Sequence, residues 1–403
     1  METFDRSPGT VAIALVATTA VQAFVTMATL TVSVFAPEAA KELGVAPENI
    51  GLYASITYIG AMIGTVTAGG FVRRYGAIRF SQISMVVCAG GLLICTGGHW
   101  SLFLVAAMIG GLGYGPTTPA SSHVLSRHTP PRFLSLVFSI KQTGVPLGGL
   151  LAGLLVPLFL AWYGWRGAAA SVVVIVVASA ILLQFTRRRF DFGMVAGEPL
   201  LRGNVMGPLR LVFARKELRL LVIGSFLFAA SQQSYIYFLV TYLETGIGWT
   251  NQQAGFALSV LGAAAVVGRI AWGALADATG RSQFVLAVIA LGMAASSAAT
   301  AFFAGEWPSW AVFIVCAAFG ATGVGWNGVY IAEITRRVAP DEVTRATGGG
   351  LFVTFAGVVT APAVFSIVVH MTGGYSAAYL ILAAGTFVVG VLMLRPEKKA
   401  IQA

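Results

Sequence analysis

The sequence predicts an all-α membrane protein whose twelve transmembrane helices form two six-helix pseudo-repeats. Of its 403 residues, 57% are hydrophobic and only 10% are charged, whereas soluble globular domains contain about 25% charged residues. The apolar residues form long runs without charge, and the two halves of the chain share a pattern of glycines. A soluble fold could not bury this much apolar surface, so we expect a protein embedded in the lipid bilayer.

The uncharged runs extend over 11–36, 50–72, 102–122 and 168–185. Each approaches or exceeds the roughly 18–20 residues with which a helix crosses a bilayer core. The remaining spans are the apolar stretches between successive loops. In chain order, the twelve predicted spans are 10–36, 49–72, 78–98, 101–125, 134–160, 166–186, 218–243, 251–276, 282–304, 308–335, 346–370 and 375–394.

The basic residues lie mostly in alternate loops and are densest in the segment 187–217. Only Lys41 and Arg166 lie in the opposite loops. The net charge of +10 therefore follows the positive-inside bias of cytoplasmic loops and does not indicate a nucleic-acid partner. We expect a multi-pass protein of the cell inner membrane with both termini and the central loop in the cytoplasm.

The two halves repeat at a nearly constant offset. A shift of 204 residues lays Gly51, Ser55, Gly64, Gly69 and Gly76 onto Gly255, Ser259, Gly268, Gly273 and Gly280. A shift of 210 residues lays Gly110, Gly113, Gly115 and Pro130 onto Gly320, Gly323, Gly325 and Pro340. This pattern predicts two parallel-related halves, 1–186 and 218–403, joined by a cytoplasmic linker at 187–217. Small residues let helices approach closely, so Gly64 and Gly268 are expected at close helix crossings.

A loop motif supports this organisation. Gly273, Asp277, Gly280 and Arg281 form the pattern G-x-x-x-D-x-x-G-R between the second and third spans of the second half. With the topology and the repeat, this motif resembles the major facilitator superfamily over essentially the whole chain. The resemblance implies a monomeric secondary transporter in which the two halves rock about a site near the membrane midplane.

The corresponding first-half loop departs from that pattern. Gly69 and Gly76 are in place, but Arg73 stands where the acid should be and Ala77 where the basic residue should be. In the family this loop is associated with a cytoplasmic gate, so the resemblance implies a gating role for both loops. The departure predicts that the first-half gate works differently from the usual one.

Lys141 and Arg269 are ionisable residues deep inside predicted spans. Lys141 follows Arg132 by nine residues and Arg269 precedes Asp277 by eight, which places them about 13 Å and 12 Å from the cytoplasmic ends of their helices. No Asp or Glu occupies the middle of any predicted span. Two buried cations need an anion, so we expect the substrate to be a small organic anion, most simply a carboxylate.

The resemblance favours the same substrate, because Arg269 lies four residues before Gly273, like the substrate-binding arginine of monocarboxylate and oxalate transporters. Structural alternatives stay open for both cations. Arg269 could snorkel or pair with backbone carbonyls, and Lys141 could reach the interface if its span began later. Further candidates for the substrate site are polar or aromatic residues at similar depth: Gln22, Tyr114, Thr117, Gln232, Asn327 and Tyr330.

A drug or metabolite exporter of the same fold is the alternative function. The segment 141–149, KQTGVPLGG, loosely resembles the Gly/Pro motif of family antiporters, and Pro146 should kink or soften its helix. Proton-driven cation exporters usually need an embedded carboxylate, which these spans lack. Proton symport is the expected energy source; sodium coupling, exchange and facilitation stay open. Without a nucleotide loop, metal-ligand cluster or nucleophile elbow, we expect no enzyme activity, cofactor or metal.

Overall fold

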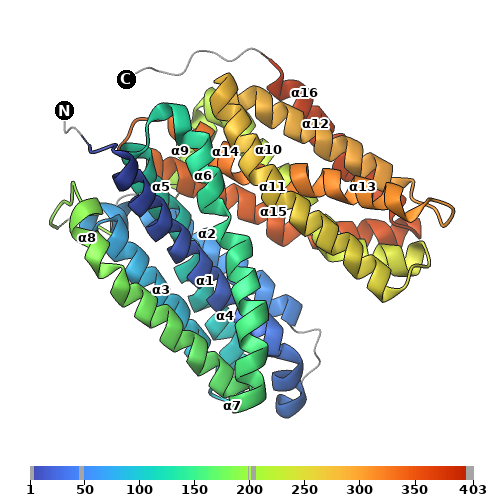
Figure 1. Ribbon diagram of the computed structural model, residues 1–403, viewed down its shortest axis with the longest axis horizontal. Helices are drawn as coiled ribbons and strands as arrows, with labels where there is room; N and C mark the ends of the chain where they lie inside the picture. Colours follow the sequence, from blue (N-terminus) through green and yellow to red (C-terminus); the bar gives the residue numbers. More distant parts are fainter. Residues whose placement is uncertain (1–3, 45–49, 198, 201–205, 396–403) are drawn as a thin grey trace. The chain divides into compact units, whose positions relative to one another are not determined.

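The computed structural model describes residues 4–44, 50–197, 199–200 and 206–395. Residues 198 and 201–205 of the predicted linker, and 396–403 of the predicted second half, lie outside the described residues. The described chain consists of helices joined by turns, without a strand among them (Figure 1). The predicted all-α class is therefore confirmed.

The helices follow the predicted spans closely. The first part of the chain forms α1 (Pro8–Leu43), α2 (Ile50–Tyr75), α3 (Ala77–Cys95), α4 (Trp100–Tyr114), α5 (Thr117–His128), the 3-10 turn η2 (Pro131–Phe133), α6 (Leu134–Gln142), α7 (Gly144–Leu182) and α8 (Gln184–Phe190). The remainder forms α9 (Gly207–Ala214), α10 (Lys216–Thr241), η3 (Tyr242–Gly246), α11 (Asn251–Thr279), α12 (Ser282–Ala301), α13 (Ser309–Phe319), η4 (Gly320–Val324), α14 (Asn327–Arg336), α15 (Val343–Thr372) and α16 (Ser376–Met393).

Among the described residues, ten helical stretches are long and apolar enough to cross a membrane. One of them, Pro131–Leu182, has 52 residues and can cross twice, because the chain turns inside α7 at Gly164 (φ 65°, ψ 179°). Helix α10 is not among the ten, and a polar run, Ser231, Gln232, Gln233 and Ser234, lies inside it. With α10 and the double crossing, the twelve predicted spans are all helical.

Three spans are interrupted by short breaks. The fourth breaks between α4 and α5 at Gly115 and Pro116, and the tenth breaks between η4 and α14. The fifth breaks at Thr143, between α6 and α7. Pro146 has no N–H to donate to the carbonyl of Gln142, the last residue of α6, so this break lies where the proline was expected to disturb the helix.

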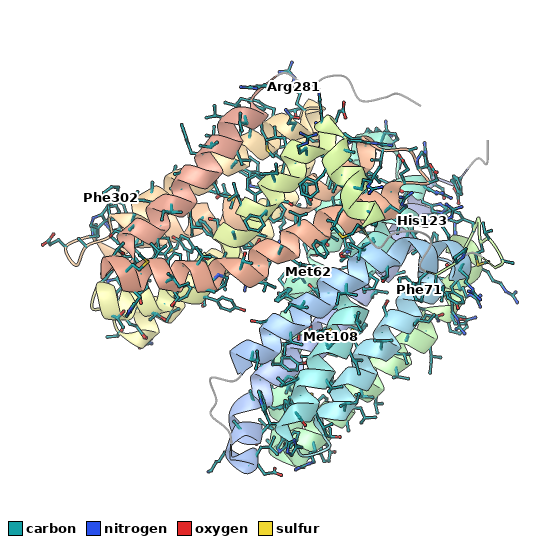
Figure 2. The ribbon with its side chains drawn as sticks, turned by 180° about the vertical axis from the view of Figure 1, so that it is seen from behind. Met62, Phe71, Met108, His123, Arg281 and Phe302 are labelled. Atoms are coloured by element: carbon teal, nitrogen blue, oxygen red, sulfur yellow. The ribbon has the colours of Figure 1, made fainter. Side chains whose placement is uncertain are left out.

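Glycines set the closest helix crossings, as expected for Gly64 and Gly268. A Cβ atom on Gly64 would lie 2.8 Å from the backbone oxygen of Leu112 in α4, and one on Gly268 would lie 2.6 Å from Ala321 Cα in η4. The second and fourth spans of each half therefore cross at equivalent positions. Met108 on α4, labelled in Figure 2, belongs to the first of these crossings, because its backbone oxygen would lie 2.5 Å from a Cβ atom on Gly60 of α2.

By its internal contacts the chain divides into two compact units. The first comprises Met1–Pro130, Lys141–Val212 and Val338–Phe352, and the second comprises Pro131–Ile140, Phe213–Arg337 and Val353–Ala403. Each unit thus includes the start of one helix from the opposite half of the sequence, α6 in the second unit and α15 in the first. In the first unit, α1 and α7 lie side by side along much of their length (Figure 1).

Candidate functional site

The side chain of Lys141, at the end of α6, is fully buried. Its Nζ atom donates to Gln22 Oε1 at 2.8 Å, to Thr118 Oγ1 at 2.9 Å and to Gln142 Oε1 at 3.0 Å. An ammonium group has three donors and no acceptor, so three neutral side chains satisfy it without a carboxylate. We refer to Gln22, Thr118, Lys141 and Gln142 as the lysine cluster.

Close packing of α7 on α1 fixes the position of this cluster. A Cβ atom on Gly144 would lie 2.7 Å from the backbone oxygen of Thr19 and 2.8 Å from Gln22 Cβ. One turn later, Gly148 packs on Thr26, where an added Cβ would lie 2.7 Å from the Thr26 Cβ atom. The glycines of the KQTGVPLGG segment therefore hold Gln22 next to the residues that follow Lys141. These glycines therefore have a packing role.

Thr117 and Tyr114 lie beside the lysine cluster at the interruption between α4 and α5. Thr117 Oγ1 donates to the Tyr114 backbone oxygen at 2.7 Å and lies 3.5 Å from Gln22 Oε1. Two of the three partners of Lys141 are the next residue, Thr118, and Gln142. Neither was among the candidates predicted from the sequence. Their adjacency to Thr117 and Lys141 is the only sequence signal that could have identified them.

Arg269 is buried on α11, with 4% of its surface exposed. Its Nε atom donates to the backbone oxygen of Val324 at 3.1 Å. Val324 is the last residue of η4, just before the interruption of the tenth span. One of the alternatives for Arg269 was pairing with backbone carbonyls, and this contact is of that kind. The interruption of the tenth span after η4 leaves backbone carbonyls without helical partners.

The other candidates of the second half gather around Trp326. Its Nε1 atom donates to Gln232 Oε1 at 3.0 Å, and its ring centroid lies 5.4 Å from that of Tyr330 in an edge-on arrangement. Asn327 follows Trp326 and is half-buried, whereas Tyr330 is buried. Gln232, Asn327 and Tyr330 therefore share one region of the second unit, which we call the tryptophan cluster.

The second-half loop holds the start of α6 through Asp277. The Asp277 carboxylate accepts the backbone N–H groups of Ser135 at 3.0 Å and of Leu136 at 2.7 Å, and it pairs with Arg336 at 2.7 Å. A carboxylate at a helix N-terminus satisfies amides that have no helical partner and complements the helix dipole. Arg336 adds a hydrogen bond to Ser135 Oγ at 2.8 Å, so the loop, α14 and α6 form one connected clamp.

The glycines of that loop have separate roles. Gly273 packs on α6, where an added Cβ would lie 2.7 Å from Ser139 Cβ. Gly280 ends α11 in the left-handed region, at φ 63°, which glycine adopts without strain. Arg281 is exposed at the turn into α12 (Figure 2).

The first-half loop is built differently. Arg73 is half-buried, and its backbone oxygen accepts Val195 N–H at 2.9 Å. Gly69 packs on the side chain of Arg345, whose Cγ atom would lie 3.0 Å from an added Cβ. Gly76 has φ 87° and packs directly on Asp191. No acid of this loop caps a neighbouring helix in the way that Asp277 does.

Asp191 instead caps α3 from the far end of the first half. Its carboxylate accepts Ile78 N–H at 2.7 Å and Arg79 N–H at 3.1 Å and lies 3.3 Å from Arg187 Nε. Burial raises the pKa of the Asp191 carboxyl above its ordinary value, although these hydrogen bonds act in the opposite direction. Asp191 could not be identified from the sequence, because nothing in it indicates that this residue meets residues more than 110 positions earlier.

Two apolar grooves, of about 460 Å³ each, lie on the first unit away from these clusters. One is bordered by α1, α3 and α7 and the other by α3, α7 and α8. Neither is lined by any of the predicted site residues. The lining of both is mostly apolar, and that of the second also includes Arg79, Gln82 and Gln184.

Comparison with known proteins gives consistent results. A family model described as the Major Facilitator Superfamily matches residues 18–329 and, in a second match, 221–402. The chain is 24% identical over 362 residues to the cis,cis-muconate transport protein of Acinetobacter baylyi, covering 87% of this chain and 86% of that protein. It is 23% identical over 374 residues to the hexuronate transporter of Bacillus subtilis, covering 89% and 88%. A solved structure of the E. coli fucose:proton symporter has the same fold, with a TM-score of 0.75 and 18% identity over 96% of this chain and 100% of that one.

Proposed function

The chain belongs to the major facilitator superfamily and is a membrane transporter, not an enzyme, and we propose that it moves a small organic anion by alternating access. The anion is a carboxylate, and its transport is coupled to protons. Each half, 1–186 and 218–403, moves largely as a body, and the segment 187–217 links them. Family membership by itself leaves the substrate undetermined, and this proposal assigns its chemical class.

The observation that carries the proposal is the buried lysine cluster. A cation inside a membrane costs several kcal/mol unless it is paired or hydrated. In the described part of the chain, the hydrogen-bonding partners of Lys141 are all neutral, so its charge is not neutralised by a nearby carboxylate. A substrate carboxylate would supply that missing charge.

Arg269 would contribute a second positive charge. A guanidinium group holds a carboxylate through two parallel hydrogen bonds, which gives a defined orientation as well as attraction. The uncharged parts of the substrate would be contacted by the other candidates, Gln22, Tyr114, Thr117, Gln232, Asn327 and Tyr330. The names of two relatives, a muconate transport protein and a hexuronate transporter, denote carboxylates and support the same substrate class.

The two loops would act as cytoplasmic gates, which involves Gly69, Arg73 and Gly76 in the first half and Gly273, Asp277, Gly280 and Arg281 in the second. The clamp between Asp277 and the start of α6 supports this role for the second loop. We further propose a monomer in the cell inner membrane with both termini in the cytoplasm, which the basic residues of alternate loops support.

Thermal stabilisation of the detergent-purified protein tests the substrate class, because a ligand that binds only the folded state raises the unfolding temperature. The panel contains cis,cis-muconate, D-glucuronate and other carboxylates, each beside its neutral methyl ester, together with cationic drugs. We expect carboxylates to stabilise the protein and the esters not to. At a concentration of 100 times Kd, the stabilisation is about 2.7 kcal/mol.

Arg269→Gln should remove this stabilisation, while Arg188→Gln, which removes an exposed arginine in α8, should keep it. The matched pair separates the loss of a site from the loss of one positive charge. Stabilisation by cationic or neutral drugs alone would overturn the anion proposal and favour the exporter. Equal stabilisation of Arg269→Gln and wild type by a carboxylate would remove Arg269 from the site.

A further inference from the structure

The lysine cluster can satisfy either protonation state of Lys141 without moving a heavy atom. As an ammonium group, Lys141 uses its three donors on Gln22, Thr118 and Gln142. The Thr118 hydroxyl, which lies 3.1 Å from Gln22 Oε1, then donates to that oxygen. As a neutral amine, Lys141 keeps its two donors on Gln22 and Gln142, and the Thr118 hydroxyl rotates to donate into the nitrogen lone pair.

A hydroxyl is the group that makes this reversal possible, because it both donates and accepts. A carboxylate in the place of Thr118 would hold Lys141 permanently charged, and an apolar residue would leave one donor unsatisfied. We infer that Lys141 is the residue that binds and releases the transported proton, with Thr118 as its reversible partner. This inference rests on the proposed function, since it assigns the coupling site of the same anion transporter.

The coupling step moves one proton. When a carboxylate enters from the side of higher proton concentration, the lone pair of neutral Lys141 takes a proton from a hydronium ion: the O–H bond breaks, an N–H bond forms and water is left. The ammonium group and the carboxylate then neutralise each other, which reduces the cost of carrying either charge through the membrane. On the other side the anion leaves, the N–H bond breaks, and water takes the proton. A monoanion and one proton cross together, so the step carries no net charge.

Other groups near Lys141 do not replace it in this role. The charged and titratable groups on the helices that contact Lys141 or pack on α6 are Glu38, Lys41 and Glu42 on α1, Tyr114 on α4, His123, Arg127 and His128 on α5, Tyr163 and Arg166 on α7, Arg269 and Asp277 on α11, and Tyr330, Glu333 and Arg336 on α14. Three of the four acids have cations of their own: Glu42 pairs with Arg166 at 2.6 Å, Asp277 with Arg336 at 2.7 Å, and Glu333 with Arg337 at 2.6 Å.

Glu38 and His123 remain to be considered. Glu38 is exposed and follows Gln22 by sixteen residues on α1, which is about 24 Å along the helix. His123 lies five residues after Thr118, about 7.5 Å along α5, where its ring stacks on Phe192 and its Nδ1 atom lies 3.4 Å from Thr344 Oγ1. Neither reaches the Lys141 nitrogen, so the proton on that nitrogen depends on the cluster and on the substrate.

The position of Lys141 suits a coupling residue. The chain passes from the second compact unit to the first between Ile140 and Lys141, and the helix is interrupted two residues later at Thr143. The residue therefore begins the part of the span that belongs to the first unit.

Two transport assays in proteoliposomes separate this inference from the proposed function. Exchange of radiolabelled D-glucuronate, a monoanion, across the membrane without a pH gradient tests anion transport. Uphill uptake of the same anion under an inward gradient of about 1 pH unit, which one coupled proton can convert into about tenfold accumulation, tests coupling. We expect wild type to perform both.

Lys141→Arg keeps the charge but cannot release its proton. We expect it to exchange the anion while losing uphill accumulation, whereas Lys216→Arg, at an exposed position on α10, should keep both activities. Lys141→Arg that accumulates the anion as strongly as wild type would overturn the proton role. Absence of exchange by wild type would count against the proposed function itself.

If Lys141→Arg is inactive in both assays, the pH profile of uptake by two Thr118 variants decides the question. Thr118→Val removes the reversible partner, so the proton is held less tightly and the pH midpoint of uptake should fall by about half a unit or more. Thr118→Ser keeps the hydroxyl and should restore the wild-type midpoint. A midpoint that is the same in wild type, Thr118→Val and Thr118→Ser would overturn the inference.

Discussion

In the second half, Asp277 holds the start of α6 through two backbone amides and Arg336, whereas in the first half Arg73 occupies the equivalent position. The start of α15 nevertheless belongs to the first compact unit, just as the start of α6 belongs to the second. The repeat has therefore kept the same partner segment for each loop while the chemistry that holds it has changed.

The first-half contact depends on shape. Gly348 on α15 packs so closely on the backbone oxygen of Thr65 that no side chain fits between them, and Gly349 packs in the same way on the backbone of Pro208. Gly69 accommodates the stem of Arg345 on the same helix. The contact of the second-half loop with α6 therefore depends on a carboxylate, whereas the contact of the first half with α15 depends on glycines, which have no side chain. Each contact should be disrupted by a different substitution.

The largest effect should come from Asp277→Asn. This change removes a nearly buried charge from the clamp and leaves Arg336 with a lost partner, for which we expect a cost of about 3 kcal/mol in unfolding free energy. Uptake should fall at least about tenfold, because the start of α6 is no longer held in one position. Thermal unfolding in detergent and uptake in proteoliposomes measure the two effects.

Asp341→Asn is the matched control, since it removes a carboxylate at an exposed position shortly before α15. It should leave stability within about 0.5 kcal/mol of wild type. If the two variants behave alike, the Asp277 carboxylate does not hold α6, and the contrast between the halves disappears.

Gly348→Ala should have the next largest effect, and through sterics alone. The added methyl group would meet the Thr65 carbonyl, which belongs to backbone and cannot rotate away, so we expect a cost of about 1–3 kcal/mol. Gly90→Ala on α3 is the control, because nothing lies within 4 Å of the added atom. That variant should be neutral or slightly stabilised, by up to about 1 kcal/mol, since alanine favours helix more than glycine does. Equal unfolding temperatures for the two variants would show that the first-half crossing tolerates a side chain.

The helices themselves could be predicted from the sequence, because a bilayer allows backbone to cross only with its hydrogen bonds satisfied, and long apolar runs then leave helix as the solution. The crossings at Gly64 and Gly268 could also be predicted, since small residues at matching offsets indicate close approach. The disturbed helix ahead of Pro146 could be predicted as well, because proline lacks the N–H of a helical hydrogen bond. The break between η4 and α14 could not be placed, since it depends on packing and local backbone geometry that single-residue preferences do not encode.

Of the residues in and around the lysine cluster and α11, the sequence analysis proposed Lys141, Arg269 and Gln22. Lys141 and Arg269 stand out because a charge inside an apolar span is rare, and the structure buries both. Most of the hydrogen-bonding partners could not be identified from the sequence. Thr118 and Gln142 are ordinary polar residues in the sequence, and the partners of Asp277 are backbone amides that every residue but proline carries. Which amides lack a helical partner is decided by where α6 begins.

The smallest effect should come from Arg73→Asp, which gives the first-half loop the acid that the second has. Arg73 is half-buried, its backbone bond to Val195 does not involve the side chain, and pairs at such positions are worth about 0–1 kcal/mol. We therefore expect uptake within about twofold of wild type, and the same for the control Arg74→Asp, which makes the same charge change at an exposed neighbour. The introduced carboxylate would lie one turn beyond Gly69, where Arg345 of α15 packs. A collapse of uptake in Arg73→Asp alone would mean that the first half holds its crossing with the arginine and not with glycines.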